Sequence, residues 1–264
     1  MAGHGRHLWR HGPRSAAGRA VRPLAGDAVG QGDGCDLAPL PRILTALIFD
    51  CDGVLVDSEP LSVAELGRTL RGQGLPVDDA DIYDRMIGRP VAEIVALYAA
   101  EHGIDATPAL PDYRARVDAL FRAGLRPLAG IGAALDALPD LPRAVASSST
   151  LPRLHLSLDL TGLHERFVPH IYSATQVSRG KPAPDLFLFA AERLGARPPD
   201  CIVIEDSVAG VTAAQAAGMR VIGLTAGGHA SAARLAERLA ELRPDALVAR
   251  TADLPGAVRA LVNR

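Results

Sequence analysis

Short apolar runs separated by helical patterns most constrain the fold of this 264-residue chain. The first run, residues 43–49, is nearly continuous in apolar and β-branched residues and stops at Asp50. Such a run is typical of a strand buried on both faces of a parallel sheet. Similar runs follow at residues 143–147, 201–204, 220–224 and 246–248, with helical patterns such as 185–194 and 208–217 between them. This alternation predicts an α/β fold with a doubly wound, Rossmann-like parallel-sheet core.

Residues 61–126 differ from the rest because they contain no strand-like run. Helical patterns cover residues 61–71, 80–86, 91–101 and 111–123. We therefore expect a helical cap inserted after the first strand, with the core formed by residues 42–60 and 127–264. Residues 1–41 are rich in Gly, Arg, Ala and His and show no periodic apolar face, which predicts a disordered N-terminal extension.

Composition excludes several classes of protein. A net charge of -2 and a pI near 6.4 provide no basic field for nucleic acid. The three cysteines, Cys35, Cys51 and Cys201, form no disulfide framework or zinc pattern, which favours a reducing, cytoplasmic location. No apolar run approaches the roughly 20 residues that cross a bilayer, so we expect no membrane partner. The sequence does not determine an oligomeric state.

Two carboxylates follow the first predicted strand in the segment DCDGVLVDS, residues 50–58. Asp50 and Asp52 then lie at the carboxyl end of a parallel strand, where open α/β sheets bind ligands. An aspartate is ionised near neutral pH and can attack phosphorus without a general base. A second carboxylate two positions on can donate a proton to the leaving group and later remove one from water.

Two further loops carry groups suited to phosphate. Ser147 and Ser148 end the second predicted strand, where hydroxyls and turn amides can hold phosphate oxygens. Of the 28 Lys and Arg residues only Lys181 is a lysine, which indicates chemistry that a planar guanidinium cannot replace. Its compact ammonium suits the charge of a phosphoryl transition state. In the same segment, GKPAPD, Asp185 is available to cap the following helix.

Glu205 and Asp206 end another predicted strand, and Ser207 after them is a suitable helix cap. Two adjacent carboxylates beside Asp50 would supply the hard oxygen ligands that Mg²⁺ prefers. Without a cation, such a cluster would repel an anionic substrate. The sequence therefore predicts a Mg²⁺ cofactor.

These four motifs resemble, in the same order, those of the haloacid dehalogenase superfamily, and they span residues 43 to about 224. The resemblance implies that Asp50 is the nucleophile and Asp52 the acid and base, whose backbone carbonyl also faces the metal. It implies that the serine loop holds the transferring phosphate. The implied metal ligands are Asp50, Asp52, Glu205 and Asp206. The helical insert looks like the cap of the beta-phosphoglucomutase-like branch, and the wording of the motifs resembles sugar-phosphate phosphatases, including enzymes that act on 6-phosphogluconate.

We expect a Mg²⁺-dependent phosphatase acting on a small phosphorylated metabolite through an aspartyl-phosphate. A sugar phosphomutase is the main alternative, but the resembled mutase carries a histidine near Ser62 and a lysine in its cap, and this cap contains no lysine. A hydrolytic dehalogenase would not need Asp52 or the Glu205–Asp206 pair. A regulator without activity predicts the loss of at least one catalytic position, and none is lost.

One cap loop, residues 86–90, lies between two helical patterns where related caps face the substrate. Gly88 can adopt backbone angles closed to other residues, and Pro90 suits the first turn of the next helix. This geometry would present Arg89 to the part of the substrate that does not react. An ordinary solvated arginine is the alternative interpretation.

Overall fold

The computed structural model describes residues 45–86, 89–231 and 234–263. All of them belong to one compact unit, Leu40–Arg264. The predicted N-terminal extension and Gly88 of the predicted cap loop lie outside the described residues.

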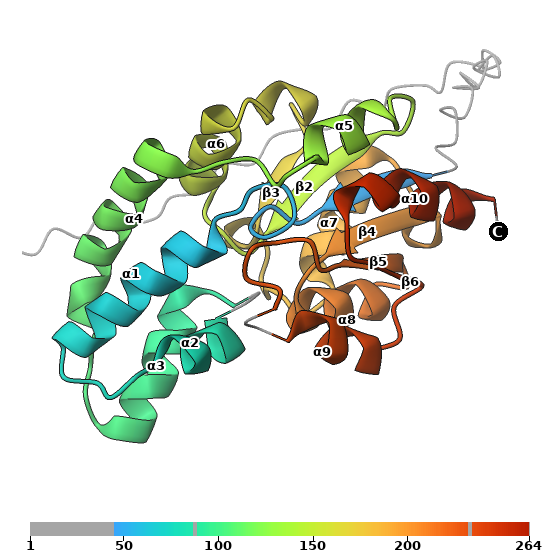
Figure 1. The fold of residues 1–264 in the computed structure, drawn as a ribbon. Helices are drawn as coiled ribbons and strands as arrows, with labels where there is room; N and C mark the ends of the chain where they lie inside the picture. Colours follow the sequence, from blue (N-terminus) through green and yellow to red (C-terminus); the bar gives the residue numbers. More distant parts are fainter. Residues whose placement is uncertain (1–44, 87–88, 232–233, 264) are drawn as a thin grey trace, which may run out of the picture. The chain divides into compact units, whose positions relative to one another are not determined.

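Six strands of the described chain form one sheet, and every pair of neighbours is parallel (Figure 1). The strands are β1 (Ala46–Phe49), β2 (Arg143–Ser147), β3 (Ile171–Ser173), β4 (Cys201–Glu205), β5 (Arg220–Leu224) and β6 (Ala246–Val248). Their order is β3-β2-β1-β4-β5-β6, so the chain winds outward from β1 in both directions. The predicted doubly wound α/β core is confirmed, and the strand order reverses at β1, where such sheets bind ligands.

Helices cover both faces of the sheet because successive side chains of each strand point to opposite faces. Leu47 and Phe49 of β1 pack with one layer, and Ala46 and Ile48 pack with the other. The first layer contains α5 (Ile131–Asp136), α6 (Leu151–Leu160) and α10 (Leu254–Val262). The second contains α7 (Asp185–Leu194), α8 (Val208–Ala216) and α9 (Leu235–Glu241). Burial on both sides fixes the end of β1, from which Asp50 extends.

Between β1 and α5, the described elements are all helical, as predicted. The four α-helices are α1 (Glu59–Gly72), α2 (Asp79–Met86), α3 (Val91–His102) and α4 (Leu110–Gly124), which lie together in Figure 1. Val63, Leu66 and Leu70 recur at helical spacing on α1 and are buried with Val117 and Phe121 of α4. Full burial of one such side chain stabilises the fold by about 1.5–3 kcal/mol. Residues 61–126 therefore form the proposed helical cap.

The chain leaves and re-enters the core through two segments that pair with each other. Val56 bridges Pro127 in antiparallel fashion, and the Asp57 N–H donates to the Arg126 carbonyl oxygen at 3.0 Å. The Gly53 N–H donates to the Val56 carbonyl oxygen at 2.8 Å. The base of the proposed cap is therefore tied directly to the loop that carries Asp50 and Asp52.

Three local predictions differ from the structure. Helix α1 begins at Glu59, before the predicted start at residue 61, because Pro60 is tolerated in a first helical turn. The edge strand β3 was not predicted, since its residues Ile171, Tyr172 and Ser173 form no continuous apolar run. Asp185 does not cap α7; its carboxylate instead accepts two hydrogen bonds from Arg179, at 2.8 and 2.9 Å. This bidentate pair satisfies the carboxylate better than one backbone N–H would.

The predicted cap at Ser207 is confirmed. Its hydroxyl oxygen accepts a hydrogen bond from the Gly210 N–H at 2.9 Å at the start of α8. Among the residues placed by the structure, no helix has both the length and the apolar character needed to span a membrane.

Candidate active site

Asp50 follows β1 directly, at the edge where the parallel strands end. Its backbone N–H donates to the Ile204 carbonyl oxygen at 3.0 Å, which continues the β1–β4 pairing to this residue. Its carboxylate Oδ1 accepts a hydrogen bond from Lys181 Nζ at 2.7 Å. Burial raises the pKa of Asp50 well above its ordinary value and outweighs the lowering by Lys181, while Glu205 raises it further. The carboxyl group therefore lies in a site with excess negative charge.

Lys181 is almost fully buried, with its side chain 1% exposed. Its Nζ lies 2.7 Å from both Asp50 Oδ1 and Glu205 Oε1, and 4.9 Å from the centroid of the Phe187 ring. Burial alone would lower the pKa of Lys181, but the two carboxylates raise it above its ordinary value. The ammonium is therefore a fixed positive charge beside Asp50.

Glu205 ends β4 and uses both carboxylate oxygens within the protein. Oε1 accepts from Lys181, and Oε2 accepts from the N–H groups of Asp206 and Ser207, each at 2.8 Å. The Ser207 hydroxyl also donates to Oε2, at 2.9 Å. The N–H groups at the start of α8 stabilise the anion. Glu205 is one of the metal ligands predicted from the sequence. In the structure its carboxylate bonds to Lys181 and so orients the ammonium.

Asp206 and His229 form an unusual buried pair next to Gly53. Asp206 Oδ2 lies 3.0 Å from His229 Nε2, but the angle forms no hydrogen bond, and both atoms lack a partner within the described chain. Burial raises the pKa of Asp206 well above its ordinary value, and Glu205 raises it further. A Cβ at Gly53 would lie 1.9 Å from Asp206 Oδ2, so only glycine allows this approach.

A divalent cation fits this corner of the site. Asp50 and Asp206 are buried carboxyl groups with raised pKa values, and Asp206 has an unpartnered oxygen. No cluster of three or more His, Cys, Asp or Glu side chains suited to a metal occurs in the part of the chain that the structure places. Mg²⁺ does not need such a cage, because it is usually bound through one or two carboxylates together with water and substrate phosphate.

Asp52 has the opposite electrostatic environment to Asp50. Its Oδ1 accepts from the Ser58 hydroxyl and its Oδ2 from the Ser149 hydroxyl, each at 2.6 Å. Arg153 Nη2 lies 3.6 Å from Oδ1. Burial would raise the pKa of Asp52, but Arg153 and the two hydroxyls outweigh it, so the pKa lies below its ordinary value. Asp52 is thus ionised without substrate, as a general base requires, and must gain a proton before it can act as an acid.

The predicted phosphate loop follows β2 and lines the same cavity as Asp50 and Asp52. Ser147 is buried, and its hydroxyl oxygen accepts from the Ser149 N–H at 3.2 Å. Ser148 and Ser149 also line the cavity, which has a volume of about 530 Å³. The structure therefore brings both predicted serines to the two aspartates, and Ser149 is the serine that contacts Asp52.

Residues of the proposed cap complete the cavity. Arg89 lines it, as do Arg114 and Arg122 of the α4 region. Glu59 at the start of α1 and Tyr113 on α4 line it from buried positions. Burial raises the pKa of Glu59 to about 8 and that of Tyr113 to about 12. Arg89 lines the cavity and is also exposed, which fits both a substrate contact and a solvated arginine, so its contact with a substrate stays a prediction.

No individual role was predicted from the sequence for Glu59, Tyr113, Ser149, Arg153 or His229. Ser149 belongs to a run of three serines, and His229 follows β5 within a Gly-Gly-His segment at the ligand-binding edge of the sheet. Because Ser149 and His229 both lie in loops that follow a strand, their positions in the sequence could have indicated that they belong to the site. Arg153 lies among 27 arginines, and only the packing of α6 against the cap distinguishes it.

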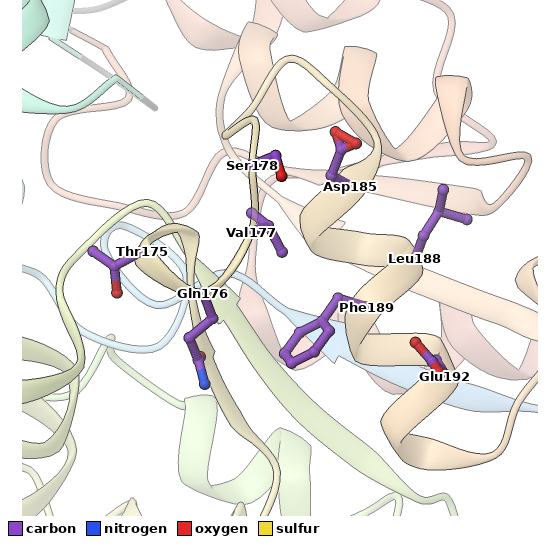
Figure 2. A pocket seen from close by; sticks show the side chains of 8 residues that line it. All are labelled: Thr175, Gln176, Val177, Ser178, Asp185, Leu188, Phe189 and Glu192. Atoms are coloured by element: carbon purple, nitrogen blue, oxygen red, sulfur yellow. The ribbon is translucent and has the colours of Figure 1, made fainter. Parts of the chain in front are cut away.

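A second hollow, of about 540 Å³, lies between residues 175–178 and one face of α7 (Figure 2). Phe189 and Leu188 face it together with Asp185 and Glu192. It is wide open, and none of its residues belongs to the cluster around Asp50. The chemistry is therefore assigned to the cavity that contains the two aspartates.

Comparisons with known proteins identify the family to which this chain belongs. A family model described as haloacid dehalogenase-like hydrolase matches residues 44–218. The 6-phosphogluconate phosphatase of Escherichia coli (strain K12) is 32% identical over 188 residues, which cover 70% of this chain and 85% of that protein. Hexitol phosphatase A of the same strain is 32% identical over 196 residues, covering 68% and 82%.

A solved structure shares the fold and much of the sequence. It is a haloacid dehalogenase-like protein of unknown function from Agrobacterium tumefaciens str. C58, with a TM-score of 0.72 and 36% identity. The match covers 82% of this chain and 98% of the other.

Proposed function

Because this chain belongs to the haloacid dehalogenase-like hydrolases, we propose that it hydrolyses a small sugar phosphate, with Mg²⁺ bound and Asp50 as the nucleophile. At the coarser level, the chain is an enzyme of the phosphoric monoester hydrolase class. The observation that carries the finer proposal is the buried Lys181, held at 2.7 Å from both Asp50 and Glu205. A cytoplasmic location remains a prediction that rests on cysteine usage.

In the first step, Asp50 attacks the phosphorus and forms an aspartyl-phosphate. Lys181 stabilises the negative charge that develops on the transferring phosphoryl oxygens. Glu205 keeps the ammonium in place, since it is fully buried and bonded to the start of α8. The hydroxyls and N–H groups of residues 147–149 hold the phosphate beside these groups.

Asp52 handles the protons of both steps. It donates a proton to the leaving alkoxide and then removes one from the water that attacks the aspartyl-phosphate. Because its pKa is low without substrate, the proton must be gained when substrate binds. The dianionic phosphate would raise the pKa of Asp52 by like-charge repulsion and so supply that change.

Asp50 and Asp206 would hold Mg²⁺, together with the backbone carbonyl of Asp52. The bound ion neutralises the excess negative charge of the site and of the phosphate. Glu205 contributes indirectly, through Lys181 and the start of α8.

The phosphomutase alternative receives less support from the cap. Ser62, at the position where the resembled mutase carries histidine, accepts a hydrogen bond from Arg153 Nη2 at 3.0 Å and has no titratable group. Analysis of products separates the two activities, because a mutase yields an isomeric sugar phosphate and a phosphatase releases inorganic phosphate.

The test is phosphate release from 6-phosphogluconate, hexitol phosphates and glucose 6-phosphate, with Mg²⁺ and with EDTA. Asp50→Asn should abolish turnover and the acid-stable labelling of the protein by radioactive phosphate, because an amide is a poor nucleophile. Asp140→Asn, at an exposed position, serves as the matched control. Turnover of Asp50→Asn within about tenfold of wild type, or full activity in EDTA, would contradict the proposal.

A further inference from the structure

Three residues that line the cavity each carry a buried polar atom with no hydrogen-bond partner within the described chain. The atoms are Glu59 Oε2, the Tyr113 hydroxyl and Arg153 Nε. We propose that these groups form a subsite for hydroxyl groups on the carbon atoms next to the phosphate ester of the substrate. The proposal rests on the phosphatase function proposed above and concerns the part of the substrate that does not react.

Because these three atoms are buried, their lack of hydrogen-bond partners indicates that a ligand pairs with them. Glu59 is 7% exposed and Tyr113 is 1% exposed, while the Arg153 side chain is 21% exposed. A buried polar group without a partner loses its hydration and gains nothing in return, so native proteins keep few of them. All three residues line the same cavity, so a ligand bound there that reaches these atoms would supply the missing partners.

The subsite lies beside the proposed acid and base. Arg153 Nη2 is 3.6 Å from Asp52 Oδ1, and Asp52 is the charge with the largest effect on the pKa of Glu59. The charges that most affect the pKa of Tyr113 are those of Arg153 and Glu59. All three residues line the cavity that contains Asp52, and Arg153 pairs with the Asp52 carboxylate, so they would contact the carbon chain near the ester oxygen.

Two helices of the proposed cap contact the Arg153 guanidinium. Nη2 donates to Ser62 Oγ of α1 at 3.0 Å, and the guanidinium carbon lies 4.6 Å from the centroid of the Phe121 ring on α4. These contacts fix the plane of the group. Its Nε–H remains a donor without a partner within the described residues, on a side chain that lines the cavity.

A hydroxyl is the neutral ligand group that pairs with all three. The Arg153 Nε–H can only donate, a tyrosine hydroxyl donates or accepts, and the Glu59 carboxyl accepts when ionised and donates when protonated. A hydroxyl can both donate and accept a hydrogen bond and so can pair with each of these groups, whereas an alkyl chain can pair with none of them. A site built to bond a substrate hydroxyl discriminates strongly against the analogue that lacks it.

The experiment compares two probes, glycerol 3-phosphate and 1-propyl phosphate, which have the same carbon chain with and without hydroxyls. The ratio of their kcat/KM values in Mg²⁺ measures the subsite. We expect wild type to favour glycerol 3-phosphate, and Tyr113→Phe to lower the ratio by about tenfold, because one hydrogen bond to a hydroxyl is lost. Glu59→Met should lower the ratio by more than Glu59→Gln does, since an amide can still donate and accept.

Tyr98→Phe is the matched control, because the Tyr98 hydroxyl donates to Asp81 Oδ2 at 2.6 Å and does not line the cavity. This variant should lower the melting temperature and keep the ratio within about twofold of wild type. Tyr113→Phe should lower the melting temperature by less than Tyr98→Phe does, since the Tyr113 hydroxyl makes no hydrogen bond of normal geometry within the described residues and interacts only weakly with Arg153.

An unchanged ratio in Tyr113→Phe, with wild type hydrolysing both probes, would overturn the subsite and leave the phosphatase function intact. A wild type that releases phosphate from neither probe nor from any sugar phosphate would overturn the proposed function, and the subsite with it.

Discussion

Among the single residues, Lys181 must contact two carboxylates at short distance and fit a buried position, and an arginine cannot do both. Its ammonium contacts Asp50 and Glu205 at the same distance of 2.7 Å in a site that excludes water. A guanidinium is larger and spreads its charge over a plane. Lys181→Arg should therefore lower kcat by roughly 10²–10³, the usual cost of losing one transition-state contact. Arg179→Lys, two residues away on the surface, is the control and should leave kcat near wild type. A near-normal rate for Lys181→Arg would contradict this role.

Glu59 should make stability depend on pH. Its pKa rises from 4.5 to about 8 on folding, chiefly through burial, with Asp52 and Asp206 adding to the rise and His229 and Arg153 opposing it. Between these two values the folded chain holds a proton that the unfolded chain has lost. The free energy of unfolding therefore falls as pH rises, by up to about 1.4 kcal/mol per pH unit.

Glu59→Gln removes this titration, so the variant should gain stability relative to wild type between about pH 5 and pH 8. Urea denaturation with chelator present in both samples measures the difference. Parallel pH profiles for the two proteins would show that Glu59 titrates normally.

The sequence predicts the residues of this site that directly follow a strand. Asp50, Ser147 and Asp206 each come at the end of a recognisable apolar run, so their meeting at one sheet edge follows from the topology. Arg153 and Tyr113 lie within helices, where the sequence only shows a helical pattern. Their approach to Asp52 depends on how α4 and α6 pack, which no local pattern encodes.

Among the helices and strands, those that the sequence predicts are again the ones with a recognisable apolar run or helical period. Strands β1, β2, β4, β5 and β6 were predicted because each gives a run of apolar residues. The short strand β3 was missed, and so was α5, a six-residue helix that is too short to show a period. The strand β6 also has only three residues, but all of them are apolar, so the composition of a short element decides whether the sequence reveals it.

The start of α8 shows an element that serves both stability and chemistry. Ser207 caps the helix through Gly210 and also donates to Glu205, which holds Lys181. Ser207→Ala should lower the free energy of unfolding by about 1 kcal/mol, the usual value of a lost cap. It should also lower kcat, because Glu205 loses one of its donors.

Asp185→Ala is the matched control for Ser207→Ala, since Asp185 pairs with the exposed Arg179 and α7 has no side-chain cap hydrogen bond. Its effect on stability should be within about 1 kcal/mol and its effect on kcat small. If both variants behave alike in urea denaturation and turnover, Ser207 has no special role.

Over the whole molecule the positive and negative charges nearly cancel, but in the site the negative charges outnumber the positive ones. The chain has a net charge of -2, yet Asp50, Asp206 and Glu205 are buried at one sheet edge with a single lysine among them. The raised pKa values of Asp50 and Asp206 mean that protons partly neutralise this cluster when no cation is bound. A divalent cation that replaces these protons binds the folded state and has no comparable site in the unfolded chain.

Mg²⁺ should therefore raise the melting temperature of the wild type, and this prediction does not require turnover. Binding at 100 times the dissociation constant stabilises the folded state by about 2.7 kcal/mol. Because the ion competes with protons on Asp50 and Asp206, the rise should be larger at pH about 8 than at pH about 6. Asp206→Asn should lose most of the rise, whereas Asp140→Asn should retain it. Thermal unfolding in MgCl₂ and in NaCl of equal ionic strength separates specific binding from screening. An equal rise in both salts, or a full rise in Asp206→Asn, would show that this cluster does not bind the ion.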